Sequence, residues 1–146
     1  MAEYTFFFNP MSRAQIARWA LHEAKADYFR WLFFAAGPLE QAATARMFGW
    51  ELPAEREMSA GFGNYDRAMG ALDGWLSTHD FVCGDRFTMV DVYVGSHVDW
   101  GMLFKSFPAL DSFVAYAERV RARPAYQEAK AIDGALIAEM QAAQAE

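Results

Sequence analysis

Ser12 is the residue whose type and position best suit a chemical role. It follows Asn9-Pro10, a pair that ends a preceding strand, and Gln15 three residues later completes a Ser-x-x-Gln capping box. This spacing predicts that a helix begins at Ser12. A hydroxyl at a helix N-terminus stabilises a nearby anion, such as a thiolate, together with the helix dipole and the free N–H groups. The alternative is that Ser12 serves only as the helix cap.

Thr88 and Asp91 also combine a hydroxyl with a carboxylate, but their spacing indicates a structural role. They occupy the first and fourth places of a Thr-x-x-Asp capping box at the start of an apolar run. In such a box the hydroxyl accepts a backbone N–H of the first turn, and the carboxylate accepts the N–H of the threonine. Phe87 and Val92 occupy the positions of a hydrophobic staple. We therefore expect Phe87, Thr88 and Asp91 to fix the start of a helix.

The other polar residues that could do chemistry are interpreted as structural. Asp99 lies in an apolar helix, where His97 or a neighbouring backbone group could satisfy its carboxylate. Cys83 is expected to be a small buried apolar residue, because no positive environment that would activate its thiol is evident. Cys83 and the three histidines, His22, His79 and His97, lack the spacing of metal ligands. We expect no metal site and no bound cofactor.

Helices must position these residues, and the central one is predicted over residues 88–104. Its side chains are apolar nearly all round: Met89, Val90, Val92, Tyr93, Val94, Val98, Trp100, Met102, Leu103 and Phe104. A helix without a polar face belongs in the middle of a bundle. We therefore expect other elements to pack around this one.

Amphipathic segments on both sides predict the surrounding helices. They span about residues 12–26, 28–50 and 64–79, and two more begin at Pro108 and Pro124. The long helix over residues 28–50 should kink at Gly37-Pro38. Residues 51–57 form a linker or a short helical turn, and Gly84-Asp85 marks a turn. The last helix has an apolar stripe of Tyr126, Ala129, Leu136, Ile137 and Met140, after which the tail is expected to fray.

Residues 3–8 read as a β-strand with apolar side chains on both faces. No later segment reads as a partner strand, so its backbone donors and acceptors need another solution. Each buried unpaired group would cost about 1–3 kcal/mol. The segment must pair with another copy of the chain, become helical or irregular, or stay loose.

The composition indicates a single globular domain, or one domain with a fragment of another. The chain has 146 residues, of which 54% are hydrophobic and 16% aromatic, enough for a sizeable core. Its net charge of −6 and scattered basic residues argue against nucleic-acid binding. One cysteine fits a reducing compartment, and no apolar stretch reaches the roughly 18 residues of a membrane helix. No signal peptide is recognisable. We expect a soluble, cytoplasmic protein.

Two parts of the chain resemble the glutathione S-transferase family, specifically a bacterial cytosolic branch. The stretch from Tyr4 to Trp19 resembles the first strand and helix of the family's thioredoxin-like domain. From about Asp27 to Asp133 the chain resembles the all-helical C-terminal domain. The most specific stretches are residues 30–38, 84–96 and 122–127.

The resemblance implies a mainly α fold, with a remnant of the thioredoxin-like domain over residues 1–27 and a glutathione S-transferase C-terminal-like helical bundle over residues 28–146. The implied activity is attack of the glutathione thiolate on a hydrophobic electrophile, with glutathione as co-substrate. Ser12 would be the catalytic hydroxyl and Arg13 its neighbour in the glutathione site, with Tyr4 a weaker alternative donor. The implied electrophile pocket, which could equally be core, consists of Phe33, Phe34, Pro38 and Trp100. The resemblance also allows a homodimer.

The chain departs from the family pattern after the first helix. Family members place several dozen residues there, which supply further strands, a cis-proline and a Glu/Gln-Ser pair that hold glutathione. Here Ala26-Asp-Tyr runs straight into Phe29-Arg-Trp. The missing segment, whether a natural truncation or an omission, would impair conjugation. The alternative function is a non-catalytic helical module that binds apolar ligands or a protein partner.

Overall fold

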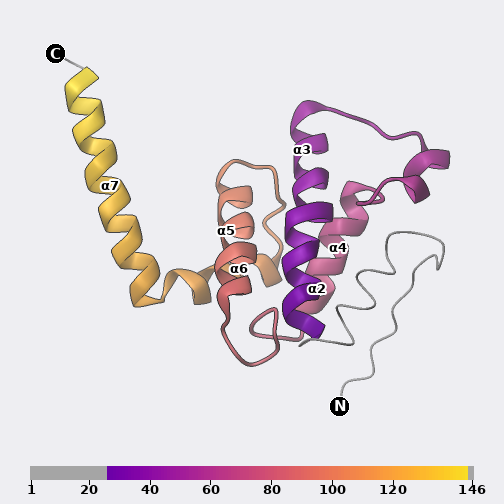
Figure 1. The fold of residues 1–146 in the computed structure, drawn as a ribbon, viewed down its shortest axis with the longest axis horizontal. Coiled ribbons are helices and arrows are strands. Elements are labelled where there is room, and N and C mark those ends of the chain that lie inside the picture. Colours follow the sequence, from indigo (N-terminus) through magenta and orange to yellow (C-terminus); the bar gives the residue numbers. More distant parts are fainter. Residues whose placement is uncertain (1–25, 145–146) are drawn as a thin grey trace.

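The computed structural model describes residues 26–144, and these are mainly helical (Figure 1). The elements in order are α2 (Ala26–Phe34), the π-helix η1 (Ala35–Leu39), α3 (Glu40–Phe48), the 3-10 helix η2 (Ala54–Ser59), α4 (Tyr65–Leu76), α5 (Met89–Leu103), α6 (Asp111–Arg121) and α7 (Pro124–Gln144). The strand predicted over residues 3–8, the helix from Ser12 and the remnant domain fall outside the described residues.

The long helix predicted over residues 28–50 is present as α2, η1 and α3, which follow one another without a break. Pro38 lies inside η1, so the predicted kink takes the form of a π-helical turn. The wide turn accommodates the proline, which has no N–H to donate. Gly49 ends α3 in the left-handed conformation with φ of 65°.

α4 follows its predicted pattern. Asn64 caps its start, because the side-chain oxygen accepts the N–H of Arg67 at 2.9 Å. The buried residues of α4 are Ala68, Met69, Leu72 and Leu76, and Tyr65 and Trp75 on the same side are half-buried. Their helical spacing is that of the amphipathic segment predicted over residues 64–79.

α5 is the central helix, but it is buried on one side only. Its inner face (Val90, Val94 and Val98, each fully buried) packs with α2, η1 and α6. Its outer face (Met89, Val92, Tyr93, Trp100 and Leu103, with Phe104 directly after the last residue of α5) is exposed. The prediction that other elements surround α5 was therefore wrong for half of its circumference. The described elements pack only on the inner side of this helix. Because its outer residues are apolar as well, the sequence pattern could not predict which side is exposed.

α6 begins at Asp111 rather than at Pro108 as predicted. Residues 104–110 turn around the C-terminal end of α5, where the N–H groups of Ser106 and Phe107 both donate to the carbonyl oxygen of Gly101 at 2.9 Å. These bonds satisfy a carbonyl that the end of a helix leaves free. Pro108 thus belongs to the connection and not to the first turn of α6.

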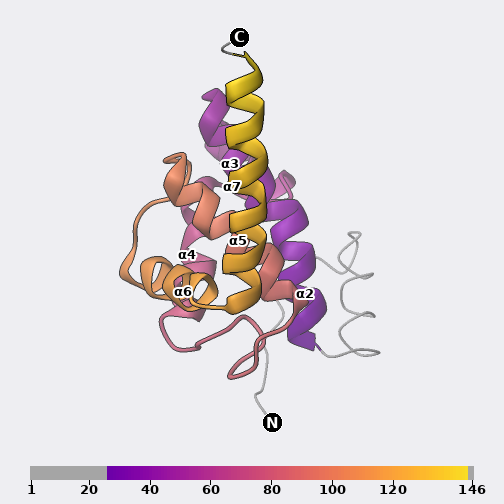
Figure 2. The ribbon, with the colours of Figure 1, turned by 90° about the vertical axis from the view of Figure 1, so that its left-hand side faces the viewer.

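α7 begins at Pro124, as predicted, and stands apart from the other helices (Figures 1 and 2). No residue of Pro124–Gln144 is buried. The predicted stripe is helical but is not packed into the core, because α7 leaves the bundle after its first turns. The expected fraying after residue 140 was wrong as far as Gln144, which is still helical. Within the described range no helix is long and apolar enough to cross a membrane.

Candidate functional site

Ser12 and Arg13, the residues that the resemblance assigns to glutathione, lie outside residues 26–144, and so does Tyr4. A site can therefore be built only from the helical part of the chain. The described residues that could bind a ligand or take part in a reaction fall into three groups. These are a buried carboxylate network at each end of α5, a groove between α3 and α5, and a pocket between α3 and α4.

Asp91 is fully buried and accepts hydrogen bonds from three segments. Oδ2 accepts the Thr88 N–H at 2.7 Å, and Oδ1 accepts the Val82 N–H and the Tyr116 hydroxyl, each at 2.9 Å. Thr88 Oγ1 accepts the Val90 N–H at 3.3 Å, so Thr88 and Asp91 form a capping box. Burial, followed by the Asp91 charge, raises the pKa of Tyr116. The carboxylate is occupied by structural bonds and is not available to a substrate.

Cys83 lies beside this network, with Sγ 3.5 Å from Thr88 Oγ1. Burial raises the pKa of its thiol, the hydrogen bond to Thr88 opposes that change, and the Asp91 charge adds to it. A raised pKa lowers the fraction of thiolate, which is the nucleophilic form. This environment is the opposite of the one that activates a cysteine.

Asp99 is buried in α5 and binds residues of α6 and α7. Arg121 Nε donates to Asp99 Oδ1 at 2.7 Å, with a further ion pair through Nη2, and the Tyr126 hydroxyl donates to Oδ2 at 2.6 Å. The expectation that His97 or a backbone group satisfies Asp99 was wrong. The partners come from residues 22 and 27 positions away, which no local spacing indicates. The network anchors the turn between α6 and α7 to α5.

A groove of about 370 Å³ runs between α3 and the outer face of α5. Large apolar side chains supply most of its wall: Met47 from α3, Tyr93, Trp100 and Phe104 from α5, and Phe107 from the following connection. Met47, Trp100 and Phe104 are each more than half exposed. Such exposed apolar surface in a concavity suits an apolar ligand.

One end of this groove is polar, because His97 and Glu40 meet there. His97 Nε2 lies 3.1 Å from Glu40 Oε2, and Nδ1 lies 2.9 Å from the Tyr93 carbonyl oxygen. Both ring nitrogens face oxygen atoms, so these two contacts fix the orientation of the imidazole ring. Glu40 is largely exposed, and the pair can therefore orient a polar group of a ligand. The two residues lie 57 positions apart, and no pattern in the sequence links them.

Only one residue of the predicted electrophile pocket lines the groove. Trp100 is on its wall, whereas Phe33 is exposed on α2 and Phe34 packs edge-on against Trp31 at 5.3 Å between ring centroids. Pro38 is half-buried in η1. The structure thus does not bring the four residues together into one site.

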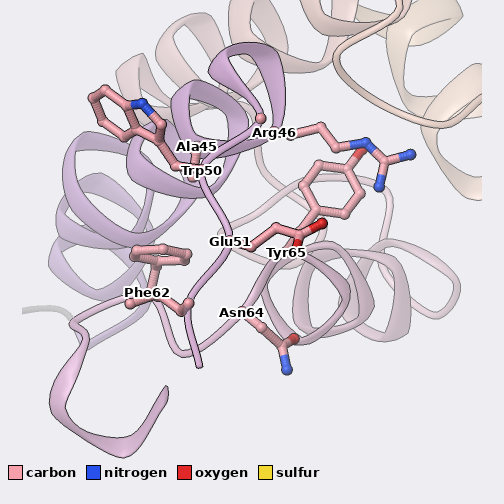
Figure 3. A pocket seen from close by; sticks show the side chains of 9 residues that line it. Ala45, Arg46, Trp50, Glu51, Phe62, Asn64 and Tyr65 are labelled. Atoms are coloured by element: carbon pink, nitrogen blue, oxygen red, sulfur yellow. The ribbon is translucent and has the colours of Figure 1, made fainter. Parts of the chain in front are cut away.

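A second pocket, of about 480 Å³, lies where α3 ends and α4 begins (Figure 3). Trp50 and Phe62 form apolar walls, and Arg46 lies over the ring of Tyr65 at 4.8 Å. Its polar groups already serve the fold: the Tyr65 hydroxyl donates to the Ser106 carbonyl oxygen at 2.7 Å, and Asn64 caps α4. Burial raises the pKa of Tyr65, while Arg46 opposes this change. The α3–α5 groove, whose wall consists mostly of apolar side chains, is the better candidate site.

A family model described as the glutathione S-transferase C-terminal domain matches residues 38–124. The match runs from Pro38 in η1 to the first residue of α7, so it covers both walls of the groove, the Asp91 network, and the Asp99 network apart from Tyr126. No curated protein and no solved structure matched the chain.

Proposed function

The chain belongs to the glutathione S-transferase family, and from that premise we propose that it takes part in glutathione conjugation by binding the hydrophobic electrophile in the α3–α5 groove. The observation that carries the proposal is the concentration of exposed apolar side chains around one concavity of α3 and α5. The groove combines a mostly apolar wall with the His97–Glu40 pair, which suits an electrophile with an apolar body and one polar substituent.

In this mechanism the thiolate sulfur of glutathione forms a bond to an electrophilic carbon. In substitution the leaving group departs with the bonding electrons. In addition the π electrons of an activated double bond shift to its other carbon, which is then protonated. The Trp100 and Phe104 rings hold the electrophile and exclude water from it. Ser12 is the proposed hydroxyl that stabilises the thiolate, with Arg13 beside it. Lowering the thiol pKa by about two units requires roughly 2.7 kcal/mol. A reducing cytoplasm would supply the glutathione.

Replacement of Trp100 tests the groove. Trp100→Ala should weaken the binding of a neutral apolar dye, N-phenyl-1-naphthylamine, about tenfold, because it removes the largest side chain from the wall. Trp50→Ala is the matched control, since Trp50 is also more than half exposed but lines the other pocket. Fluorescence titration of the three proteins gives the dissociation constants. Equal weakening by both replacements would show that the dye does not use the groove.

Replacement of Ser12 tests the chemistry separately. Ser12→Ala should reduce the rate of glutathione addition to a nitro-activated aryl chloride at least tenfold at pH 7, while dye binding and the far-ultraviolet circular dichroism stay unchanged. Ser77→Ala serves as the control, because the Ser77 hydroxyl donates only to the Asp73 carbonyl oxygen at the exposed end of α4. An unchanged rate in Ser12→Ala would remove Ser12 from the mechanism.

A non-catalytic helical binding module is the second candidate, and the exposed outer face of α5 favours it. A ligand or partner that covers this face would need no glutathione. Calorimetric titration with glutathione separates the two functions. Measurable heat with a millimolar or tighter dissociation constant supports conjugation, and no heat with millimolar glutathione supports the binding module.

A further inference from the structure

The outer face of α5 is an apolar surface that the described residues leave open. Met89, Val92, Tyr93, Trp100, Leu103 and Phe104 recur at helical spacing along the whole length of α5, and each is between 38% and 70% exposed. Ser96 is the polar residue among them, and its hydroxyl donates to the Val92 carbonyl oxygen at 2.6 Å. The surface therefore presents no unsatisfied polar group to a partner.

α7 carries a second open apolar surface. Ile132, Leu136 and Met140 follow one another at four-residue intervals, with Ile137 beside them, and each is more than half exposed. The opposite side of α7 is lined by the small residues Ala131, Ala135, Ala138 and Ala142. Helices derive most of their stability in proteins from packing an apolar stripe, and nothing in the described part of the chain packs on this one.

The two surfaces together are large enough for a stable protein interface. Taking about 200 Å² for a large side chain, the exposed portions of these ten residues amount to roughly 1,000 Å² per chain. A standard interface uses about 800 Å² on each partner.

The position of α7 excludes the simplest arrangement, in which it covers α5 of its own chain. The Tyr126–Asp99 hydrogen bond and the Lys130 ammonium, 5.0 Å from the centre of the Trp100 ring, hold the first turns of α7 beside α5. After its first turns α7 runs away from the bundle (Figure 1), so its stripe does not reach the α5 surface. Each chain thus has an exposed apolar stripe on α7 and an exposed apolar face on α5, and neither surface packs against the other within one chain.

We propose that two copies of the chain exchange their α7 helices, so that the α7 stripe of each copy packs on the outer face of α5 in the other. A two-fold exchange pairs both surfaces at once and leaves neither open, which is the closed arrangement typical of symmetric dimers. Tyr93, Trp100 and Phe104 also line the α3–α5 groove. The α7 helix of the second copy therefore closes the open side of that groove. The dimer itself does not depend on glutathione chemistry.

Light scattering coupled to size exclusion tests the dimer. The unaltered protein at about 50 µM should have twice the mass of the chain, and Leu136→Glu should reduce it to the mass of one chain by placing a charge in the interface. Ala138→Glu places the same charge on the opposite side of α7 and should leave the dimer intact. A monomeric unaltered protein, as expected if another part of the same chain covers α5, would overturn the proposal.

A mixing experiment tests the exchange itself. Leu103→Glu alters the α5 surface and should also give a monomer. An equimolar mixture of Leu136→Glu and Leu103→Glu should regain dimer, because one of the two α7–α5 contacts is then intact. If the dimer instead pairs α7 with α7, Leu103→Glu alone stays dimeric, and if it pairs α5 with α5, Leu136→Glu alone stays dimeric. Either result, or a mixture that stays monomeric, refutes the exchange. Circular dichroism of each variant shows that the change in mass does not come from unfolding.

Discussion

Asp91 shows how one side chain can hold several segments of this protein together. Its carboxylate accepts the N–H of Thr88 at the start of α5, the N–H of Val82 in the preceding connection and the hydroxyl of Tyr116 in α6. A capping role alone explains only the first of these bonds. The sequence predicted that role from the four-residue spacing, but it contained no sign of the two bonds that reach beyond the helix.

Removal of this carboxylate should therefore cost more than a cap. Asp91→Ala leaves two buried N–H groups and a buried hydroxyl without their acceptor, and we expect a loss of about 3–5 kcal/mol in the free energy of unfolding. Asp111→Ala, in the exposed first turn of α6, should cost less than about 1 kcal/mol. Urea denaturation measures both. A loss of only 0.5–2 kcal/mol for Asp91→Ala, the usual value of a cap, would mean that the other bonds contribute little.

At the scale of the elements, the end of α5 depends on a glycine. A Cβ atom at Gly101 would overlap the ring of Phe107, which is buried against this turn. The same residue supplies the carbonyl oxygen that Ser106 and Phe107 share. The close approach of the chain after α5 thus requires the absence of a side chain at this position.

Gly101→Ala should lower the free energy of unfolding by about 1–3 kcal/mol, because the Phe107 ring must move from its packed position. Gly134→Ala in α7 is the control, since no neighbouring atom lies within 4 Å of a Cβ atom there. The control should gain up to about 1 kcal/mol in local helix stability. Equal behaviour of the two variants in thermal unfolding would contradict the steric argument.

Local signals in the sequence predicted the elements well where one residue dominates. Pro124 opens α7, Asn64 precedes α4, and Gly37-Pro38 marks the distortion between α2 and α3. Pro108 misled the prediction of α6, because a proline suits a connection as well as a first turn. The difference was decided by the hydrogen bonds to Gly101, which only the folded chain reveals.

At the scale of the whole molecule, burial was harder to predict than helicity. α5 reads as apolar on every side, yet only its inner face is covered, and the stripe of α7 reads as a core face, yet no residue of Pro124–Gln144 is buried. Apolar patterns show that a surface needs a partner without showing where the partner comes from. The groove was missed for a related reason, since its walls come from segments about 50 residues apart.

Hydrogen exchange should reveal the same contrast. Amides of α5 should be strongly protected, because its inner face lies in the core, whereas amides of residues 132–144 should exchange quickly in dilute protein. Raising the concentration from about 1 to 100 µM should slow exchange in α7 if that helix packs on a second copy. Mass spectrometry of peptic peptides reports both regions. Strong protection of α7 at the lowest concentration would mean that this helix is covered within one chain.

The π-helical turn at Ala35–Leu39 sets the rotational phase between α2 and α3. Trp31, Ala35, Leu39, Ala42 and Ala45 are all buried, at the three- and four-residue spacing that keeps side chains on one side of a helix. Deleting one residue from this turn would rotate α3 by about 100° relative to α2. Ala42 and Ala45 would leave the interior, and Met47 would no longer border the groove. The chain should therefore tolerate substitutions in this turn far better than changes in its length.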